Sequence, residues 1–212
     1  NVTRELVGGS VPASEHSVEC MNYDFEQGSD KDYILRLCKL YPNGIVSCVL
    51  DGFDYWGALT ETLLDPDVHS AIIDRNGKFV VRGDSGNPVD IVAGLDKNSY
   101  YITEDGKYRD VATAELIPEH IVKGSVETLY DIFGGEINSK GYKVLCSKIG
   151  FIYGDAITLD RAYEICRRLK EKKFASTNWV AGVGSFTYQY NTRDSFGFAV
   201  KATAGQIENK GE

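Results

Sequence analysis

The chain has 212 residues, of which 42% are hydrophobic and 25% are charged, a balance typical of globular domains and not of disordered segments. Its net charge of −8 at pH 7 argues against nucleic acid as a partner, although a local anion site remains compatible with it. No apolar run approaches the roughly 20 residues that span a bilayer, and the start lacks the apolar core of a signal peptide. We therefore expect a cytoplasmic protein with no membrane contact.

Five cysteines are spread along the chain without a CxxC pair or a Cys/His metal spacing. Each lies in an apolar run, so we expect reduced core thiols, as in cytosolic proteins. The chain also begins and ends within its structural pattern, and we expect it to be part of a longer polypeptide.

In the first part of the chain, Val7–Ser17 predicts a short strand, a turn and a helix start, with Ser14 as a helix cap. Asp30 is expected to cap a second helix, which ends before Pro42. After a strand, a helical pattern covers Phe53–Leu64 and a turn follows at Asp65-Pro66-Asp67. Asn76-Gly77, between two apolar runs, predicts a hairpin or tight turn.

Four apolar, β-branched runs end abruptly in a polar or glycine tip. They are Val46–Asp51, Lys78–Asp84, Lys148–Asp155 and Trp179–Ser185. Continuous apolar runs of this kind predict buried parallel strands. Because loops at the carboxyl ends of parallel strands build active sites in α/β folds, we expect these tips to converge on one face.

Helical patterns separate the later strands. Val89–Gly94 predicts a short helix, and Val122–Phe133 a longer one. Between them, residues 97–121 form a polar and aromatic stretch that we interpret as a loop or hairpin insertion. Thr158–Lys173 is the strongest helix pattern, with Thr158 as its cap. A last strand is expected at Ser195–Ala204, and the alternation of strands and helices predicts a parallel sheet or a β/α barrel.

The sharpest local motif is Arg82-Gly83-Asp84, in which both charged side chains project to one side of a strand end. Arginine binds a phosphate or an amide oxygen, and aspartate holds a metal or ribose hydroxyls. The alternatives are a surface ion pair or an RGD adhesion tripeptide. Asp51 and Asp155 also end strands, where an aspartate often only caps the next helix.

His16, beside Glu15 at a loop–helix junction, is a candidate acid, base or nucleophile, and its alternative is a surface or capping histidine. We expect the other two histidines, His69 and His120, to be structural. The glycine turn Gly182–Ser185 can cradle a phosphate through backbone N–H groups. Arg193 and Lys201, which follow it, can meet phosphate or be ordinary surface charges. Together these residues predict a site for a sugar phosphate with a divalent metal.

Six segments in this order resemble the nicotinamide phosphoribosyltransferases, more closely the bacterial or phage members than the animal ones. They are SVPASEHS, VSCVLDGFDYW, VVRGDSGNPVD, SKGYKVL, YGDAITLD and GVGSFTYQYNTRD. The resemblance runs from about Gly9 to Ala204. It implies a β/α barrel-like core of the type II phosphoribosyltransferases, incomplete in this chain, with the active site at a homodimer interface. The implied reaction makes nicotinamide mononucleotide and pyrophosphate from nicotinamide and phosphoribosyl pyrophosphate, assisted by Mg²⁺ and coupled to ATP through a phosphohistidine.

The resemblance also assigns roles to residues. His16 matches the phosphorylated histidine, and Asp51 and Asp84 match aspartates near the ribose, pyrophosphate and magnesium. The two aspartates are expected to act on the metal either from outside its direct ligands or through the substrate pyrophosphate. The positions matched to substrate binding are Ser10 and Val11 at the nicotinamide pocket, Arg82 at the amide and ribose, Gly154 and Asp155 at the ribose, Gly184 and Ser185 at the 5′-phosphate, and Arg193 and Lys201 at phosphate across the dimer. Ser185 departs from the family pattern, which has a second glycine there.

The family's nicotinamide site also uses an aspartate and aromatic residues upstream of this start, and basic residues beyond this end. We therefore interpret residues 1–212 as the central catalytic segment of a larger enzyme, inactive without the other segments. Two alternatives stay open: a nicotinate-using relative, and a catalytically silent fragment that binds phosphoribosyl ligands or assembles with partner chains.

Overall fold

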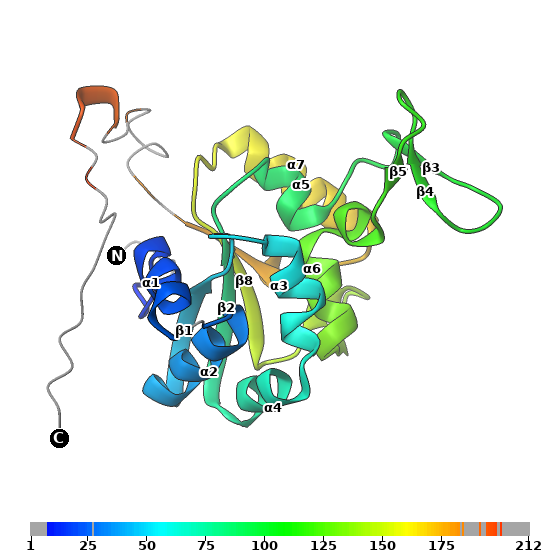
Figure 1. Cartoon of the computed structure of the whole chain (residues 1–212). Coiled ribbons are helices and arrows are strands. Elements are labelled where there is room, and N and C mark those ends of the chain that lie inside the picture. Colours follow the sequence, from blue (N-terminus) through cyan, green and yellow to red (C-terminus); the bar gives the residue numbers. More distant parts are fainter. Residues whose placement is uncertain are drawn as a thin grey trace, which may run out of the picture.

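The computed structural model describes residues 8–26, 28–182, 184, 191, 194–198 and 200. A parallel sheet of four strands, in the order β1-β2-β8-β9, forms the centre of an α/β fold (Figure 1). Its strands are β1 (Asn43–Val49), β2 (Asn76–Gly83), β8 (Ile149–Tyr153) and β9 (Trp179–Ala181). The four predicted parallel strands are thus confirmed.

Helices connect and cover these strands. Their bounds are α1 (His16–Glu26), α2 (Asp30–Leu40), α3 (Tyr55–Thr60), α4 (Pro66–Asp74), α5 (Pro88–Ala93), α6 (Glu119–Phe133) and α7 (Leu159–Glu171), with short 3₁₀ turns η1 (Thr62–Leu64), η2 (Ser176–Asn178) and η3 (Asp194–Phe196). Helix α5 packs against both α6 and α7, and α2 packs against α4. Within the described residues, none of these helices has the length and apolar character needed to cross a bilayer.

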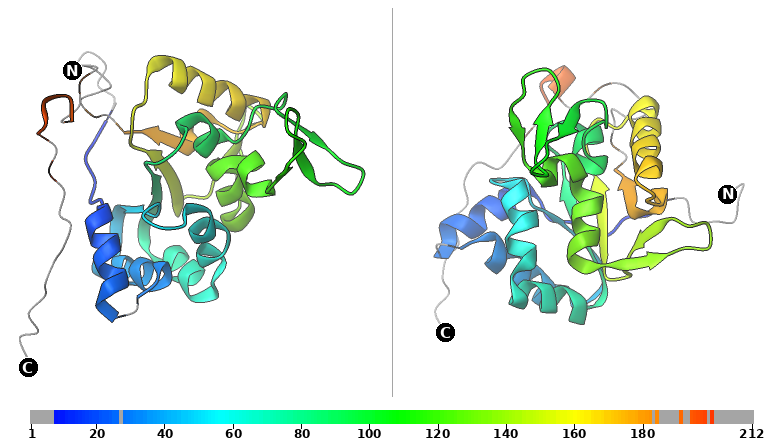
Figure 2. Two further views of the ribbon diagram at one scale, coloured as in Figure 1. Left: turned by 45° about the horizontal axis from the view of Figure 1, so that its top comes forward. Right: turned by 90° about the vertical axis from the view of Figure 1, so that its right-hand side faces the viewer.

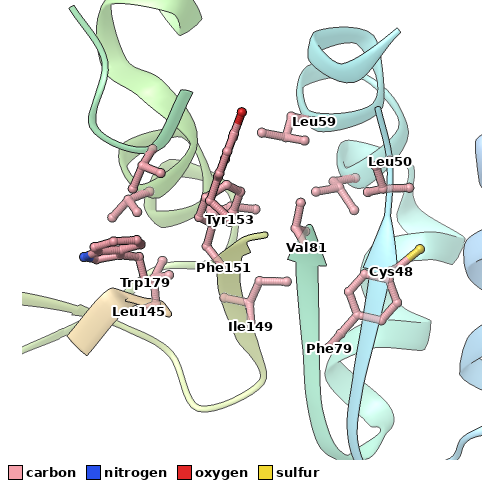
Figure 3. Packing of buried hydrophobic residues seen from close by; sticks show 14 of the residues in the cluster. Cys48, Leu50, Leu59, Phe79, Val81, Leu145, Ile149, Phe151, Tyr153 and Trp179 are labelled. Atoms are coloured by element: carbon pink, nitrogen blue, oxygen red, sulfur yellow. The ribbon is translucent and has the colours of Figure 1, made fainter. Parts of the chain in front are cut away.

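Alternate residues of the strands build the core on the helix-covered side of the sheet. Phe79 and Val81 of β2 and Phe151 of β8 are almost completely buried there (Figure 3). The next residues along each strand point to the opposite face, where Val180 of β9 is 57% exposed. One face of the sheet is therefore a closed core, whereas the other is partly open.

Two small antiparallel sheets project from this body (Figure 2). Strands β3 (Tyr100–Ile102), β4 (Tyr108–Asp110) and β5 (Leu116–Ile117) form one of them, within the stretch that the sequence marks as an insertion. Strands β6 (Gly135–Ile137) and β7 (Lys143–Leu145) form the other, which the sequence patterns did not predict.

Two predictions about the segment before β2 are wrong. The turn predicted at Asp65-Pro66-Asp67 is instead the start of helix α4. The carboxylate of Asp65 caps this helix by accepting the backbone N–H groups of Asp67 and Val68. Asn76-Gly77 is no hairpin, because these residues open β2 directly after that helix. The apolar run before them belongs to a helix, which the short pattern did not distinguish from a strand.

Other predicted boundaries also change. The helix expected at Phe53–Leu64 divides into α3 and η1. The cap of α2 is Ser29, one residue before the predicted Asp30. Ser14 caps no helix, because its hydroxyl accepts the N–H of Val49. The strand expected at Ser195–Ala204 starts instead as the 3₁₀ turn η3, and residues 199 and 201–204 lie outside the described residues. The cap of α7 at Thr158 is confirmed.

Candidate active site at the carboxyl ends of the strands

A histidine–aspartate pair joins α1 to the end of β1. His16 opens α1, and Asp51 follows β1 by two residues. Nε2 of His16 lies 2.9 Å from Oδ1 of Asp51. The aspartate side chain is 3% exposed, whereas the imidazole is 41% exposed. The carboxylate therefore fixes one ring nitrogen, while part of the ring stays open to a ligand.

The segment before α1 holds this pair in place because it runs along β1 as a short parallel bridge. The N–H of Ser14 donates to the carbonyl of Ser47, and the N–H of Ser47 donates to the carbonyl of Pro12, both at 2.9 Å. The hydroxyl of Ser14 accepts the N–H of Val49 at 2.9 Å. These bonds fix where α1 begins relative to the end of β1.

Asp51 is ionised more readily than an ordinary aspartate. Burial by itself would raise its pKa, but hydrogen bonds from the backbone N–H of Asp84 and the side chains of Ser85 and His16 lower the pKa below the usual value. Oδ2 of Asp51 accepts the Asp84 N–H at 2.8 Å. The ends of β1 and β2 are thus joined through one carboxylate.

The arginine and aspartate at the end of β2 form a close ion pair. Nε of Arg82 lies 2.8 Å and Nη2 lies 2.5 Å from Oδ2 of Asp84. Nη1 of Arg82 donates to the carbonyl of Ser14 at 2.9 Å. Burial by itself would lower the pKa of Arg82, but Asp84 and the charges of Glu15 and Asp51 raise it. The guanidinium therefore stays charged.

The same aspartate reaches the end of β8. Oδ1 of Asp84 accepts the backbone N–H of Gly154 at 3.1 Å. A Cβ on Gly154 would lie 2.4 Å from Oδ1 of Asp84, and a Cβ on Gly182 would lie 2.6 Å from Cα of Gly154. Glycine is needed at both positions because the ends of β2, β8 and β9 approach so closely.

This geometry excludes the adhesion interpretation of Arg82-Gly83-Asp84. The two charged side chains are 16% and 17% exposed, lie at the end of a central strand and bind each other. An adhesion tripeptide requires an accessible loop. The structure thus brings His16, Asp51, Arg82, Asp84 and Gly154 into one hydrogen-bonded network, which we call the strand-end network.

The other predicted site residues lie outside this network. Ser10 and Val11 are exposed in the segment before α1, and Asp155 is exposed directly after Gly154. Gly184 is exposed beyond β9. The remaining three predicted site residues, Ser185, Arg193 and Lys201, lie outside the described residues.

The two histidines predicted to be structural contact aromatic rings away from the network. His69 stacks on Phe133 with a centroid distance of 4.8 Å, and His120 lies 5.1 Å from the ring of Trp56.

Sequence reasoning missed a carboxylate next to the network. Glu19 of α1 is 0% exposed, and its two oxygens lie 3.3 and 3.1 Å from the backbone N of Gly52. Burial, together with the charges of Asp30 and Asp51, raises the pKa of Glu19 to about 8, although the Gly52 hydrogen bond lowers it. The available signal was the spacing of three residues from His16, which places both side chains on one side of α1.

The described residues contain no group of three or more His, Cys, Asp or Glu side chains able to hold a metal ion. Asp51 and Asp84 offer the oxygen ligands that Mg²⁺ prefers, but all four of their carboxylate oxygens already accept a hydrogen bond. A magnesium ion here would need oxygen ligands from a bound substrate.

Comparison of the chain with known proteins identifies similar sequences and a matching family. Relatives named nicotinamide phosphoribosyltransferase are 44% identical over 210 residues in Acinetobacter baylyi and 36% identical over 203 residues in Mycoplasma pneumoniae. These matches cover 97% and 94% of this chain but 38% and 40% of the relatives, so the chain spans about two fifths of their length. The family model described as "Nicotinate phosphoribosyltransferase (NAPRTase) family" matches residues 3–212. The chain belongs to this family of phosphoribosyltransferases.

Proposed function

We propose that this chain is the central catalytic segment of a nicotinamide phosphoribosyltransferase. The whole enzyme transfers the phosphoribosyl group of phosphoribosyl pyrophosphate to nicotinamide, giving nicotinamide mononucleotide and pyrophosphate in NAD salvage. The observation that carries the proposal is the strand-end network, in which hydrogen bonds link one histidine, two aspartates and one arginine in series. The names of the two relatives support nicotinamide as the base.

The chemistry of the transfer suits these residue types. Displacing pyrophosphate from C1 of ribose develops positive charge on the sugar ring, which nearby carboxylates stabilise. Asp51 and Asp84 supply two carboxylates at adjoining strand ends, and the Arg82 guanidinium offers a charged donor for an amide or ribose oxygen. Gly154 and Asp155, at the end of β8, are proposed to bind the ribose hydroxyls.

His16 is proposed to take the γ-phosphate of ATP. When Nε2–H donates a hydrogen bond to Asp51, the lone pair on Nδ1 is available for attack, and the imidazole is 41% exposed. Attack by Nδ1 forms the N–P bond and breaks the bond to the bridging oxygen, which leaves with ADP. The positive charge that the ring gains is balanced by Asp51, whose lowered pKa keeps it ionised.

Mg²⁺ is the proposed metal, and it would neutralise the charge of the pyrophosphate leaving group when bound with the substrate. Asp51 and Asp84 would hold it through that substrate, since each carboxylate oxygen already has a hydrogen-bond partner.

The finer architecture is also a proposal: a β/α barrel-like core of the type II phosphoribosyltransferases, completed by further strands and working as a homodimer. The partly open sheet face near Val180 supports this, because apolar strand residues are normally covered. Ser10 and Val11 are assigned to the nicotinamide pocket, and Gly184, Ser185, Arg193 and Lys201 to phosphate binding.

The proposal is tested by assaying the whole protein that contains this sequence with phosphoribosyl pyrophosphate, ATP, Mg²⁺ and either nicotinamide or nicotinate. We expect nicotinamide mononucleotide as the faster product, with ATP stimulation that His16→Gln abolishes. His69→Gln is the matched control, because His69 stacks on Phe133 away from the network.

Two other outcomes would replace the proposal. Faster turnover of nicotinate would identify the nicotinate-using relative. Binding of phosphoribosyl pyrophosphate without turnover, measured by calorimetry, would identify the silent binding module.

A further inference from the structure

Glu19 is a carboxylate in a position where burial is costly. It lies one turn into α1, three residues after His16, and it is 0% exposed. Removing a carboxyl group from water is unfavourable unless hydrogen bonds or a function compensate. An apolar residue would fill the same position at less cost, so the contacts of this side chain need an explanation.

Glu19 contacts the loop that carries Asp51, the aspartate that binds His16. Both oxygens of Glu19 lie within 3.3 Å of the backbone N of Gly52, the residue directly after Asp51. A Cβ on Gly52 would lie 2.5 Å from Oε2 of Glu19, so the contact requires glycine there. Helix α1, which carries the histidine, is thereby bound to the loop that carries its aspartate partner.

The histidine–aspartate pair is thus held from two sides. On one side, Ser14 binds the segment before α1 to Ser47 and Val49 of β1. On the other side, Glu19 binds the first turns of α1 to the loop after β1. These two attachments flank the pair, in which Nε2 of His16 lies 2.9 Å from Oδ1 of Asp51.

We propose that Glu19 is a positioning residue, which holds the Asp51 carboxylate against Nε2 of His16 and so prepares Nδ1 for phosphorylation. The role in phosphorylation rests on the proposed function, whereas the effect on the His16–Asp51 hydrogen bond does not. Glu19 acts as an acceptor for the Gly52 N–H, so a side chain of equal length with an acceptor oxygen replaces it.

Three substitutions separate these properties in the whole protein. Glu19→Gln keeps the length and an acceptor oxygen but carries no charge. Glu19→Asp keeps the carboxylate but is one methylene shorter, so it does not reach Gly52. Glu19→Ala removes the group. Asp30→Ala is the control for losing a neighbouring buried charge, because Asp30 of α2 is 7% exposed and acts on Glu19 through its charge, whereas the hydrogen bond to Gly52 is made by Glu19.

The first readout is the histidine ring ¹⁵N–¹H spectrum, with His16 assigned by its loss in His16→Gln. We expect a protonated Nε2 bonded to Asp51 in the parent, in Glu19→Gln and in Asp30→Ala, and loss of that signature in Glu19→Asp and Glu19→Ala. The second readout is single-turnover transfer of ³²P from γ-labelled ATP to His16. We expect it to slow about tenfold or more in Glu19→Asp and Glu19→Ala, and less than about threefold in Glu19→Gln.

The outcomes are distinguishable. A folded Glu19→Asp or Glu19→Ala protein with an unchanged His16 signature overturns the positioning role, as does an equal change in Asp30→Ala. If Glu19→Ala does not fold, Glu19→Asp against Glu19→Gln decides. If the His16 signature changes as expected while the parent takes no ³²P, the positioning role stands and the proposed function fails.

Discussion

At the scale of single residues, Asp51 connects the histidine to the rest of the strand-end network. Its Oδ1 faces His16 and its Oδ2 accepts the N–H of Asp84. Asp51→Asn keeps an acceptor for that N–H but removes the charge that balances a positive imidazole. We expect the proposed phosphate transfer to His16 to fall about 100-fold or more while the fold is kept.

The measurement is single-turnover labelling from γ-³²P ATP, alongside the thermal unfolding midpoint. Asp54→Asn serves as the control, since Asp54 caps the nearby helix α3 without contacting His16. Equal labelling by Asp51→Asn and the parent would exclude a role for the Asp51 charge.

The raised pKa of Glu19 predicts a pH dependence of stability. Burial raises this pKa from 4.5 to about 8, so the folded protein binds a proton that the unfolded chain releases at lower pH. This contribution is complete below about pH 4.5 and is lost as the pH rises through about 8. The full shift of about 3.5 units corresponds to an upper bound of about 5 kcal/mol.

We therefore expect Glu19→Gln to gain stability relative to the parent between pH 5 and pH 9, by a few kcal/mol. Urea unfolding at pH 5, 7 and 9 measures the difference. A difference between the two proteins that stays constant with pH would contradict the raised pKa.

At the scale of secondary structure, the start of the sheet depends on one close approach of two strands. Gly77 of β2 faces Gly44 of β1, and a Cβ on Gly77 would lie 1.9 Å from the carbonyl oxygen of Gly44. Because backbone atoms have no room to move aside, we expect Gly77→Ala to destabilise the protein by about 2 kcal/mol or more.

Gly150→Ala is the matched control in the neighbouring strand β8. Its Cβ would meet only side-chain atoms, the nearest being Cδ of Lys78 at 3.1 Å, which can move. We expect a loss below about 1 kcal/mol, measured by urea unfolding. Equal losses of unfolding free energy in both variants would contradict the prediction that the close approach of β1 and β2 requires glycine at position 77.

The sequence predicted the elements whose pattern is long or has a single physical meaning. The four apolar strands and the Thr158 cap are such cases. Buried parallel strands appear as continuous apolar runs, and a helix start appears as a capping residue such as threonine before a helical pattern. Asn76-Gly77 misled because the same dipeptide suits a hairpin and a helix-to-strand junction. The strands β6 and β7 are three residues each, too short for a period to be recognised.

The sequence predicted the site residues that end apolar strands, but it did not predict the buried residue whose position depends on helix packing. Asp51, Arg82 and Asp84 end apolar runs, so their meeting follows from the parallel sheet. Glu19 was not predicted, because its burial depends on how α1 is rotated against the end of β1, and only the bonds of Ser14 and Gly52 fix that rotation.

At the scale of the whole molecule, the sheet formed by β3, β4 and β5 pairs only with itself among the described strands. It projects from the body (Figure 1), so the core does not depend on its pairing. By strand spacing, the ends of β3 and β5 that join the body are about 12 Å apart. We expect a five-residue Gly-Ser linker in place of residues 101–116 to leave the fold intact.

The unfolding midpoint and the His16 ring spectrum test this expectation. We expect the midpoint to change by only a few degrees and the His16–Asp51 signature to persist. Global unfolding of the shortened protein would show that the projecting sheet is part of the cooperative unit.

The bond between Oδ1 of Asp84 and the N–H of Gly154 joins residues 70 positions apart. On a ribosome that adds about 5–20 residues per second, Gly154 is made about 4–14 s after Asp84. Throughout that interval the emerging polypeptide has the histidine and its aspartate but lacks the third strand end. A chain terminated before β8 therefore lacks Gly154, and Oδ1 of Asp84 has lost the backbone N–H that it accepts in the folded protein.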